Sequence, residues 1–236
     1  MILGNSGESG FTLTELLIGI VLSGIVIAGV YGFFVSQIKT YSLQEQLVEM
    51  QENARIAIDT IVMGLQNAGY DPTNSPFGFG ITSSDFSSRC SALPLTTSNE
   101  LYFTVDEVQE SPTSIIANND TERFGFKLDS SGSLVAAAIS GSDGSITGWD
   151  PIADNIDVLS FTYTYADGNT SSGTNDLPSN IVVGRKFDDI RKVTISLTAK
   201  TNQIDPNYVG DGFRRLTLTA EVSPRNLVPP FGISCS

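Results

Sequence analysis

The hydrophobic pattern changes along the chain, and its first part is a continuous apolar run. Residues 16–35 contain no charged side chain. A helix of about 20 residues rises about 30 Å, the thickness of the hydrocarbon core of a bilayer. The run therefore predicts a helix that crosses a membrane. A single carboxylate, Glu15, stands at its start. Because a carboxylate in an apolar environment is costly unless it is paired, we expect Glu15 to have a partner.

Small residues recur within the run at a spacing of four. Gly19 and Ser23 form one such pair, and Gly24 and Ala28 form another. Small residues at this spacing let two helix backbones approach closely in lipid, which favours association of the run with another helix. The alternative is that glycine is simply more frequent in membrane helices than in soluble ones.

From residue 37 onwards the pattern becomes amphipathic. Apolar residues recur at steps of three and four: Leu47, Met50, Ala54, Ala57, Ile58, Ile61, Leu65 and Ala68. This spacing places them on one face of a helix, which we expect to pack on a sheet of the same chain; a partner helix is the alternative. Gly69 suits a helix C-terminus, and Pro72 cannot continue a helix. One helix is therefore predicted from about Thr12 to Ala68.

After residue 72 the helical pattern gives way to turn residues and short alternating segments. Residues 101–105 are a strand candidate, and residues 123–128 and 134–139 predict a hairpin around a turn at 129–132. Strict alternation in three segments predicts antiparallel strands with one face on the helix; these are residues 159–165, 193–199 and 216–222. Ile156 and Val158 are out of phase with the first of them, which predicts a bulge or a late start. The predicted fold class is α+β, with a long N-terminal helix packed on an antiparallel sheet.

Residues 10–17 carry a motif of known meaning. Gly10-Phe11-Thr12-Leu13-Thr14-Glu15-Leu16-Leu17 resembles the class III prepilin signal of type IV pilins and type II secretion pseudopilins. The resemblance implies that a prepilin peptidase cuts between Gly10 and Phe11 and methylates the new amine of Phe11, leaving the apolar run on the mature protein. Glu15 then becomes the fifth residue, the position that this family uses for filament assembly. The partners implied are prepilin peptidase and other pilin subunits, major and minor, bound through the N-terminal helix.

A second resemblance lies in the amphipathic half. Met50-Gln51-Glu52-Asn53-Ala54-Arg55, followed by Ala68-Gly69-Tyr70, is similar to PilW-type minor pilins. The resemblance implies a pilin-like organisation in four segments: a prepilin leader over 1–10, a membrane-spanning and filament-core half of the helix over 11–36, an amphipathic half over 37–69, and a globular β-rich head over 70–236. It also implies storage in the inner membrane as a single-pass protein, with the head outside the cytoplasm, before transfer to a surface filament.

The composition argues against several classes of function. The chain has 13 basic and 26 acidic residues, a net charge of −13, and no histidine. An acidic head is a poor match for phosphate backbones, so no nucleic-acid partner is expected. Without histidine there is no Ser-His-Asp or Cys-His arrangement, and we expect no enzymatic activity. The acidic turns lack the spacing of a calcium loop and are interpreted as Asx turns, so no metal or cofactor is predicted.

The chain has two cysteines, Cys90 and Cys235. In a protein exported across a membrane, two cysteines favour a disulfide, and one pair allows only one connectivity. The alternative is two buried free thiols.

The function predicted from these patterns is that of a minor pilin subunit of a type IV pilus, acting in assembly initiation or near the tip. Two alternatives stay open. One is a J-type pseudopilin of a type II secretion system, and the other is a filament-borne adhesin or ligand-binding head.

Overall fold

The structure is a computed structural model that describes residues 10–70, 81–82, 99–105, 123–139, 148–172 and 190–226. The chain divides into two compact units. Met1–Gln46 is called the helical unit here, and Leu47–Ser236 is called the head unit. The predicted disulfide between Cys90 and Cys235 lies outside the described residues.

One helix, α1 (Leu13–Asn67), contributes to both units and has 55 residues. Its observed bounds agree with those predicted within one residue. Gly69 follows it with a φ of 81°, a left-handed conformation that glycine adopts without steric cost. Within the described residues, α1 is the one helix long and apolar enough to cross a membrane, judged by length and composition.

The described strands of the head unit form two antiparallel sheets. Sheet A has the order β1-β2-β3-β4-β5, and its strands are β1 (Ile81–Thr82), β2 (Glu100–Thr104), β3 (Arg123–Leu128), β4 (Leu134–Ile139) and β5 (Asp150–Ala153). Sheet B has the order β7-β6-β8-β9, and its strands are β6 (Ile156–Tyr165), β7 (Thr170–Ser171), β8 (Ile190–Lys200) and β9 (Arg215–Val222). The hairpin predicted at 123–139 is confirmed with its predicted bounds, and so is an irregularity at Ile156 and Val158, where the register of β6 on β8 shifts.

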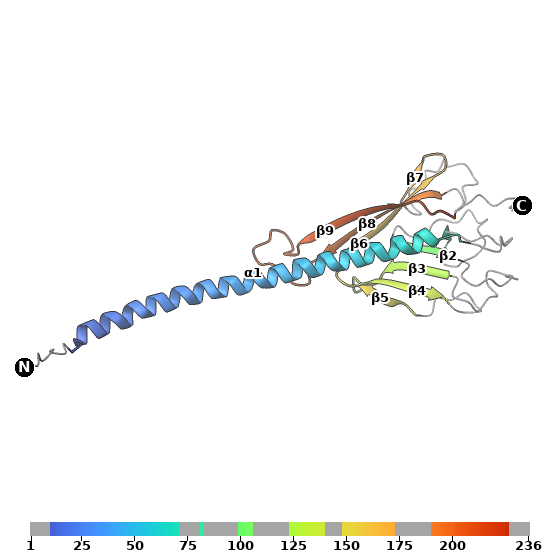
Figure 1. The fold of residues 1–236 in the computed structure, drawn as a ribbon. Coiled ribbons are helices and arrows are strands. Elements are labelled where there is room, and N and C mark those ends of the chain that lie inside the picture. Colours follow the sequence, from blue (N-terminus) through green and yellow to red (C-terminus); the bar gives the residue numbers. More distant parts are fainter. Residues whose placement is uncertain are drawn as a thin grey trace, which may run out of the picture. The chain divides into compact units, whose positions relative to one another are not determined.

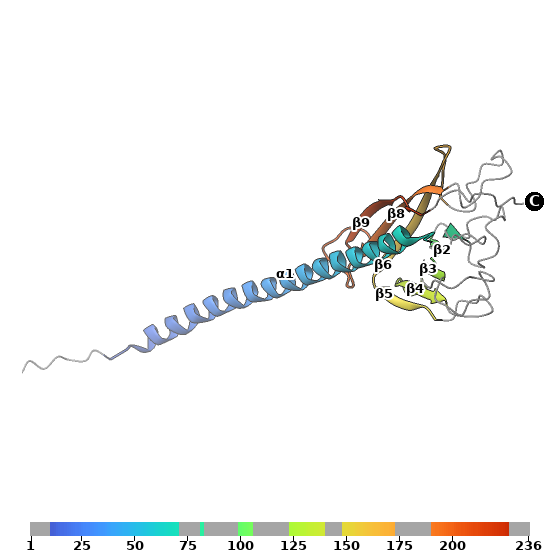
Figure 2. The same ribbon diagram turned by 45° about the vertical axis from the view of Figure 1, so that its right-hand side comes forward.

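The head half of α1 supplies the centre of the core. Figures 1 and 2 show sheet B on one side of this half of the helix and sheet A on the other. Ala54, Ala57, Ile61 and Leu65 are completely buried in one apolar cluster that draws side chains from both sheets. The predicted packing of the amphipathic stripe on the chain's own sheets is therefore confirmed. The prediction named one sheet, whereas two share the helix.

Candidate functional site

The predicted processing site lies just before α1. Gly10 and Phe11 are outside the helix and exposed, and the Phe11 side chain is 89% exposed. Proteases cleave exposed segments without regular structure far more readily than helices. The bond between Gly10 and Phe11 is thus placed where a peptidase can reach it.

Glu15, the third residue of α1, takes part in capping the N-terminus of that helix. One carboxylate oxygen, Oε2, accepts hydrogen bonds from the Thr12 backbone N–H at 3.0 Å and from the Thr12 hydroxyl at 2.8 Å. In return, the Glu15 N–H donates to Thr12 Oγ1 at 3.3 Å. This reciprocal arrangement is a capping box, which satisfies N–H groups that have no partner inside the helix. The Thr12-x-x-Glu15 spacing is visible in the sequence, but we interpreted Glu15 there only as an assembly residue.

The second carboxylate oxygen of Glu15 is available. Among the described residues, Oε1 makes no hydrogen bond and no ion pair, because both contacts from Thr12 are made to Oε2. Glu15 can therefore keep its cap and still offer one oxygen to a cation outside the chain.

A shallow groove runs along the helix face that begins at Glu15, with a volume of ≈ 500 Å³. It is lined by Phe11, Glu15, Leu16, Gly19, Ile20, Ser23, Gly24 and Ile27. The predicted small pair Gly19 and Ser23 lies in it. The Ser23 hydroxyl donates to the Gly19 carbonyl at 2.7 Å, so its proton is satisfied inside the helix. The groove therefore presents an apolar surface with Glu15 at one end.

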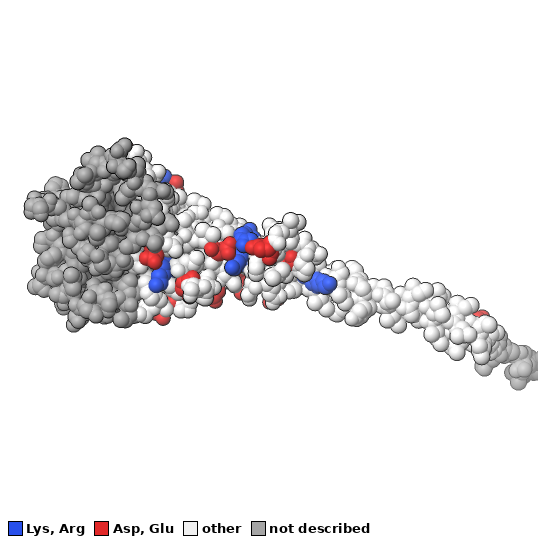
Figure 3. Space-filling view, turned by 180° about the vertical axis from the view of Figure 1, so that it is seen from behind, with Lys and Arg blue, Asp and Glu red and all other residues white. Residues whose placement is uncertain are grey.

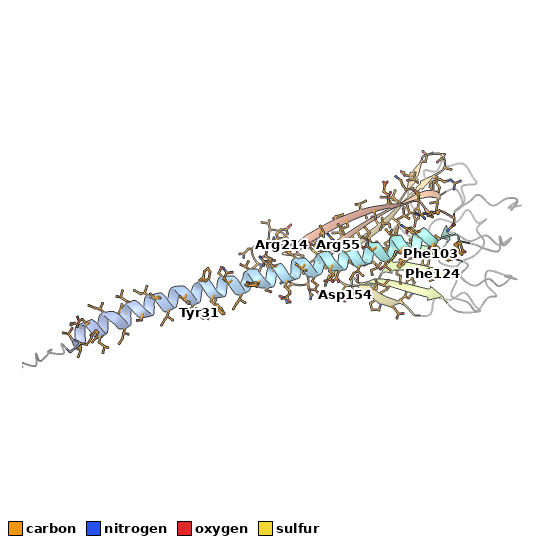
Figure 4. The ribbon with its side chains drawn as sticks, viewed as in Figure 1. Tyr31, Arg55, Phe103, Phe124, Asp154 and Arg214 are labelled. Atoms are coloured by element: carbon orange, nitrogen blue, oxygen red, sulfur yellow. The ribbon has the colours of Figure 1, made fainter. Side chains whose placement is uncertain are left out.

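Among the described residues, nothing apart from the helix's own neighbouring backbone fills the space around the glycines of this half. A Cβ atom built at Gly19, Gly24, Gly29 or Gly32 meets no atom within 4 Å. The large apolar side chains between Leu16 and Phe34 are all more than half exposed, and this part of α1 is almost uniformly white in Figure 3. Tyr31, labelled in Figure 4, is 69% exposed. An apolar surface of this extent is typical of a segment that meets lipid or another protein.

Ion pairs join several charges on sheet B and on the connection between β8 and β9. Arg214 donates to Asp205 through Nε at 3.1 Å and Nη2 at 2.8 Å, and Lys192 pairs with Glu221 at 2.9 Å. Figure 3 shows red and blue atoms intermixed over the head rather than gathered by sign. Ion pairs therefore form at both described pairs of adjacent basic residues, Arg191/Lys192 and Arg214/Arg215.

Arg215 joins two carboxylates, Asp157 and Asp211. Its guanidinium, together with the Phe213 N–H, lowers the pKa of Asp211 to about 2. Arg215 and then Lys200 lower the pKa of Asp157. Asp211 and Asp205 also accept backbone N–H groups two residues later in the chain, which confirms the interpretation of these acids as Asx turns. No group of acids that could hold a metal ion occurs in the described part of the chain.

These lowered pKa values predict that the head loses stability in acid. A carboxylate with a depressed pKa stabilises the fold fully above its unfolded pKa of about 3.9, and this contribution is lost as the pH falls through the folded value. For Asp211 the window runs from about pH 4 to about pH 2. Urea unfolding of the full chain in detergent, followed by Trp149 fluorescence at pH 7, 4 and 2, measures the loss.

Arg215→Gln is the matched control for the acid prediction. It removes the cation that faces both Asp157 and Asp211. We expect the variant to be less stable than the parent at pH 7 and the two proteins to converge at pH 2. A difference that is as large at pH 2 as at pH 7 contradicts the prediction.

Two family descriptions match the chain. "Prokaryotic N-terminal methylation motif" matches residues 5–31, and "Prepilin peptidase-dependent protein B" matches residues 43–221. No curated protein matches the sequence. Among solved structures, the chain is similar to the type IV-like pilin TTHA1219 from Thermus thermophilus, at 12% identity and a TM-score of 0.48, over 75% of this chain and 98% of that chain.

The first match confirms the prepilin resemblance of residues 10–17, whereas the PilW-type resemblance stays a prediction. The second match spans more than half of the chain. The chain therefore belongs to the prepilin peptidase-dependent protein B family and is a type IV pilin-like protein with an N-terminal methylation motif.

Proposed function

We propose that this protein is a minor pilin subunit, stored in the inner membrane with its head outside the cytoplasm and assembled into a type IV pilus through the first half of α1. Its place is at assembly initiation or near the tip. The observation that carries the proposal is the apolar half of α1, which overlaps the methylation motif and whose large apolar side chains are exposed from Leu13 to Phe34. The role is structural, because the features that support it are a processing site and an assembly surface.

Processing creates the positive charge that assembly uses. Cleavage after Gly10 creates a cationic primary amine at Phe11. Methylation converts it into a secondary amine, which is still protonated near neutral pH, so the positive charge stays in place. In lipid, an unpaired carboxylate and an unpaired amine are both costly, so each is stabilised by meeting the other. Glu15 Oε1 of one subunit is the acceptor for the Phe11 amine of its neighbour, while Oε2 keeps the Thr12 cap. The pair fixes the register of two helices that apolar contacts alone leave free to slide.

The glycines give a second reason for helix association. A glycine inside a helix costs about 0.5–1 kcal/mol relative to alanine. Among the described residues, no atom outside the neighbouring helix backbone lies within 4 Å of a Cβ built at Gly19 or Gly24, so no described packing requires either glycine. Close approach of another helix backbone would explain why glycine is needed at these positions. The groove at Gly19 and Ser23 is the surface on which we place that neighbour.

The intact mass of the protein isolated from its cells tests the processing step. We expect a mass that lacks residues 1–10 and carries one added methyl group. Gly10→Val, which places a branched side chain at the cleavage position, is the control and should yield the uncut chain. A parent protein that retains Met1 contradicts the processing proposal.

Deletion of the gene tests the role in a pilus. Loss of surface pili with normal protein export supports a minor pilin. Loss of protein export with normal pili instead assigns the chain to a secretion filament.

A further inference from the structure

We propose that the head unit binds a helix of a different, more basic subunit along the face of α1 that points away from the core. This face is called the outer stripe and consists of Val48, Glu49, Glu52, Ile56, Asp59 and Met63. The inference rests on the proposed filament function and adds the kind of partner to it.

The outer stripe has apolar residues where a solvated helix face normally has polar ones. Val48 is 61% exposed, Ile56 is 44% exposed and Met63 is 60% exposed. At about 100° per residue these three side chains lie within about 80° of one another. The same geometry places them opposite the completely buried Ala57 and Ile61. Spacings of eight and seven residues are those at which one helix meets another over several turns.

The outer stripe is also acidic and unpaired. The side chains of Glu49, Glu52 and Asp59 form no ion pair or hydrogen bond with any other described residue, and neither does that of Arg55. Four acids on sheet B and on the connection between β8 and β9 behave differently, because each faces a lysine or an arginine; these are Asp157, Asp205, Asp211 and Glu221. Figure 4 shows that Arg55 comes from the head half of α1, and it is the one base between residues 47 and 67.

A groove adjoins the stripe at Met63, with a volume of ≈ 260 Å³. Its lining residues are Thr60, Met63, Gly64, Asn67, Phe103, Val105, Phe124 and Phe126. Phe103 stacks on Phe124 at 5.5 Å and on Phe126 at 6.0 Å, and Figure 4 shows Phe103 and Phe124 near the end of α1. A Cβ at Gly64 comes within 2.9 Å of Phe103, so glycine is the residue that fits this floor. An apolar side chain of a partner fits such a groove better than water does.

Charge decides between possible occupants. A second copy of this chain brings three more acids and one base to the interface, and its acidic stripe is repelled by an identical one. An anionic lipid surface is repelled for the same reason. A helix that carries lysine or arginine beside a bulky apolar residue complements both the carboxylates and the groove. The partner is therefore a pilin-type subunit of different sequence.

Photo-crosslinking in the cells that produce the protein tests this inference. Ile56 is replaced by p-benzoylphenylalanine in the full chain, and the crosslinked peptide is identified by mass spectrometry. We expect the peptide to come from the N-terminal helix of another pilin-type subunit and to contain Lys or Arg within about four residues of the crosslink. The same probe at Thr219, on the exposed face of β9, should give at most about one-fifth of the adduct.

Charge reversal gives the second arm. Glu52→Lys together with Asp59→Lys should lower the yield of the Ile56 adduct about fivefold, because two attractions become repulsions. Three results would overturn the inference. The first is an adduct between two copies of this chain, and the second is the absence of any adduct at Ile56. The third is an adduct yield that the charge reversal leaves unchanged.

A p-benzoylphenylalanine probe at Val21, in the apolar half of α1, distinguishes failure of the outer-stripe inference from failure of the proposed filament function. Crosslinks to other subunits at Val21 without a heterologous crosslink at Ile56 refute the outer stripe and leave the filament role standing. The absence of crosslinks at both positions refutes both.

Discussion

Glu15→Gln is expected to leave the protein in the membrane and to lower its incorporation into filaments at least about tenfold. Breaking a buried ion pair by removing one partner costs about 3–5 kcal/mol, because the other charge is left uncompensated, and about 1.4 kcal/mol already corresponds to a factor of ten. Glutamine at this position still accepts the Thr12 hydrogen bonds of the capping box, so the helix start is retained. Immunoblots of sheared filaments and of membranes measure the two populations.

Thr12→Ala is the complementary variant. It removes the hydroxyl that takes part in the cap and leaves the carboxylate of Glu15 in place. Loss of an N-cap costs about 1 kcal/mol of helix stability, a small effect on a helix of this length. We therefore expect near-normal incorporation. If Thr12→Ala fails to assemble while Glu15→Gln assembles normally, Glu15 is a capping residue alone and the charge pair is wrong.

These two variants matter because the structure gives Glu15 a role that its place in the apolar run does not suggest. A carboxylate before an apolar segment looks unpaired when only the run is considered. The hydrogen bonds to Thr12 show that it is satisfied locally through Oε2. The assembly that we propose needs only Oε1, and the cap through Oε2 offsets part of the desolvation cost of Glu15.

The helix and the longest strands could be predicted because their signals are local. The three-and-four spacing between Leu47 and Ala68 continued without a break, and Gly69 marked its end, so α1 was placed within one residue. Alternation along β6, β8 and β9 was equally strict, and the out-of-phase Ile156 indicated the register shift that is observed.

The elements that were missed lack local signals. β5 contains Pro151, which has no backbone N–H to donate and is confined to edge strands, and β5 is indeed the last strand of sheet A. β7 is two residues long, too short to show alternation. The division of the strands into two sheets depends on non-local pairing. The capping box is a different case, since its Thr-x-x-Glu spacing was present and the membrane interpretation of Glu15 obscured it.

In the candidate site, too, the features with a local sequence signal could be predicted and the others could not. Gly10, Phe11 and Glu15 were predicted from a contiguous motif, and their processing and assembly roles stay predictions. The groove beside Gly19 could be anticipated only as a pair of small residues, because its volume depends on side-chain directions. The outer stripe was not recognised at all. Its apolar residues are separated by acids, and a helix face is seen as unpartnered only when the core on the opposite face is known.

Ile61→Ala is expected to lower the free energy of unfolding of the head by about 2–5 kcal/mol, the usual cost of truncating a fully buried isoleucine. Ile61 is completely buried in the cluster that joins α1 to both sheets. Urea unfolding of the full chain in detergent measures the change through Trp149, whose ring lies 6.4 Å from that of Tyr102 in sheet A.

Met63→Ala, two residues further along the same helix, is the matched control for Ile61→Ala. Met63 is 60% exposed, and substitutions of exposed residues usually change stability by less than about 0.5 kcal/mol. We therefore expect an unfolding curve that overlies that of the parent, together with a weaker crosslink from the probe at Ile56. Equal losses of stability in the two variants would mean that the helix face opposite the core is itself packed in the head. In that case the outer stripe has no free surface to offer, and the sheets alone do not account for the stability that α1 gives to the head.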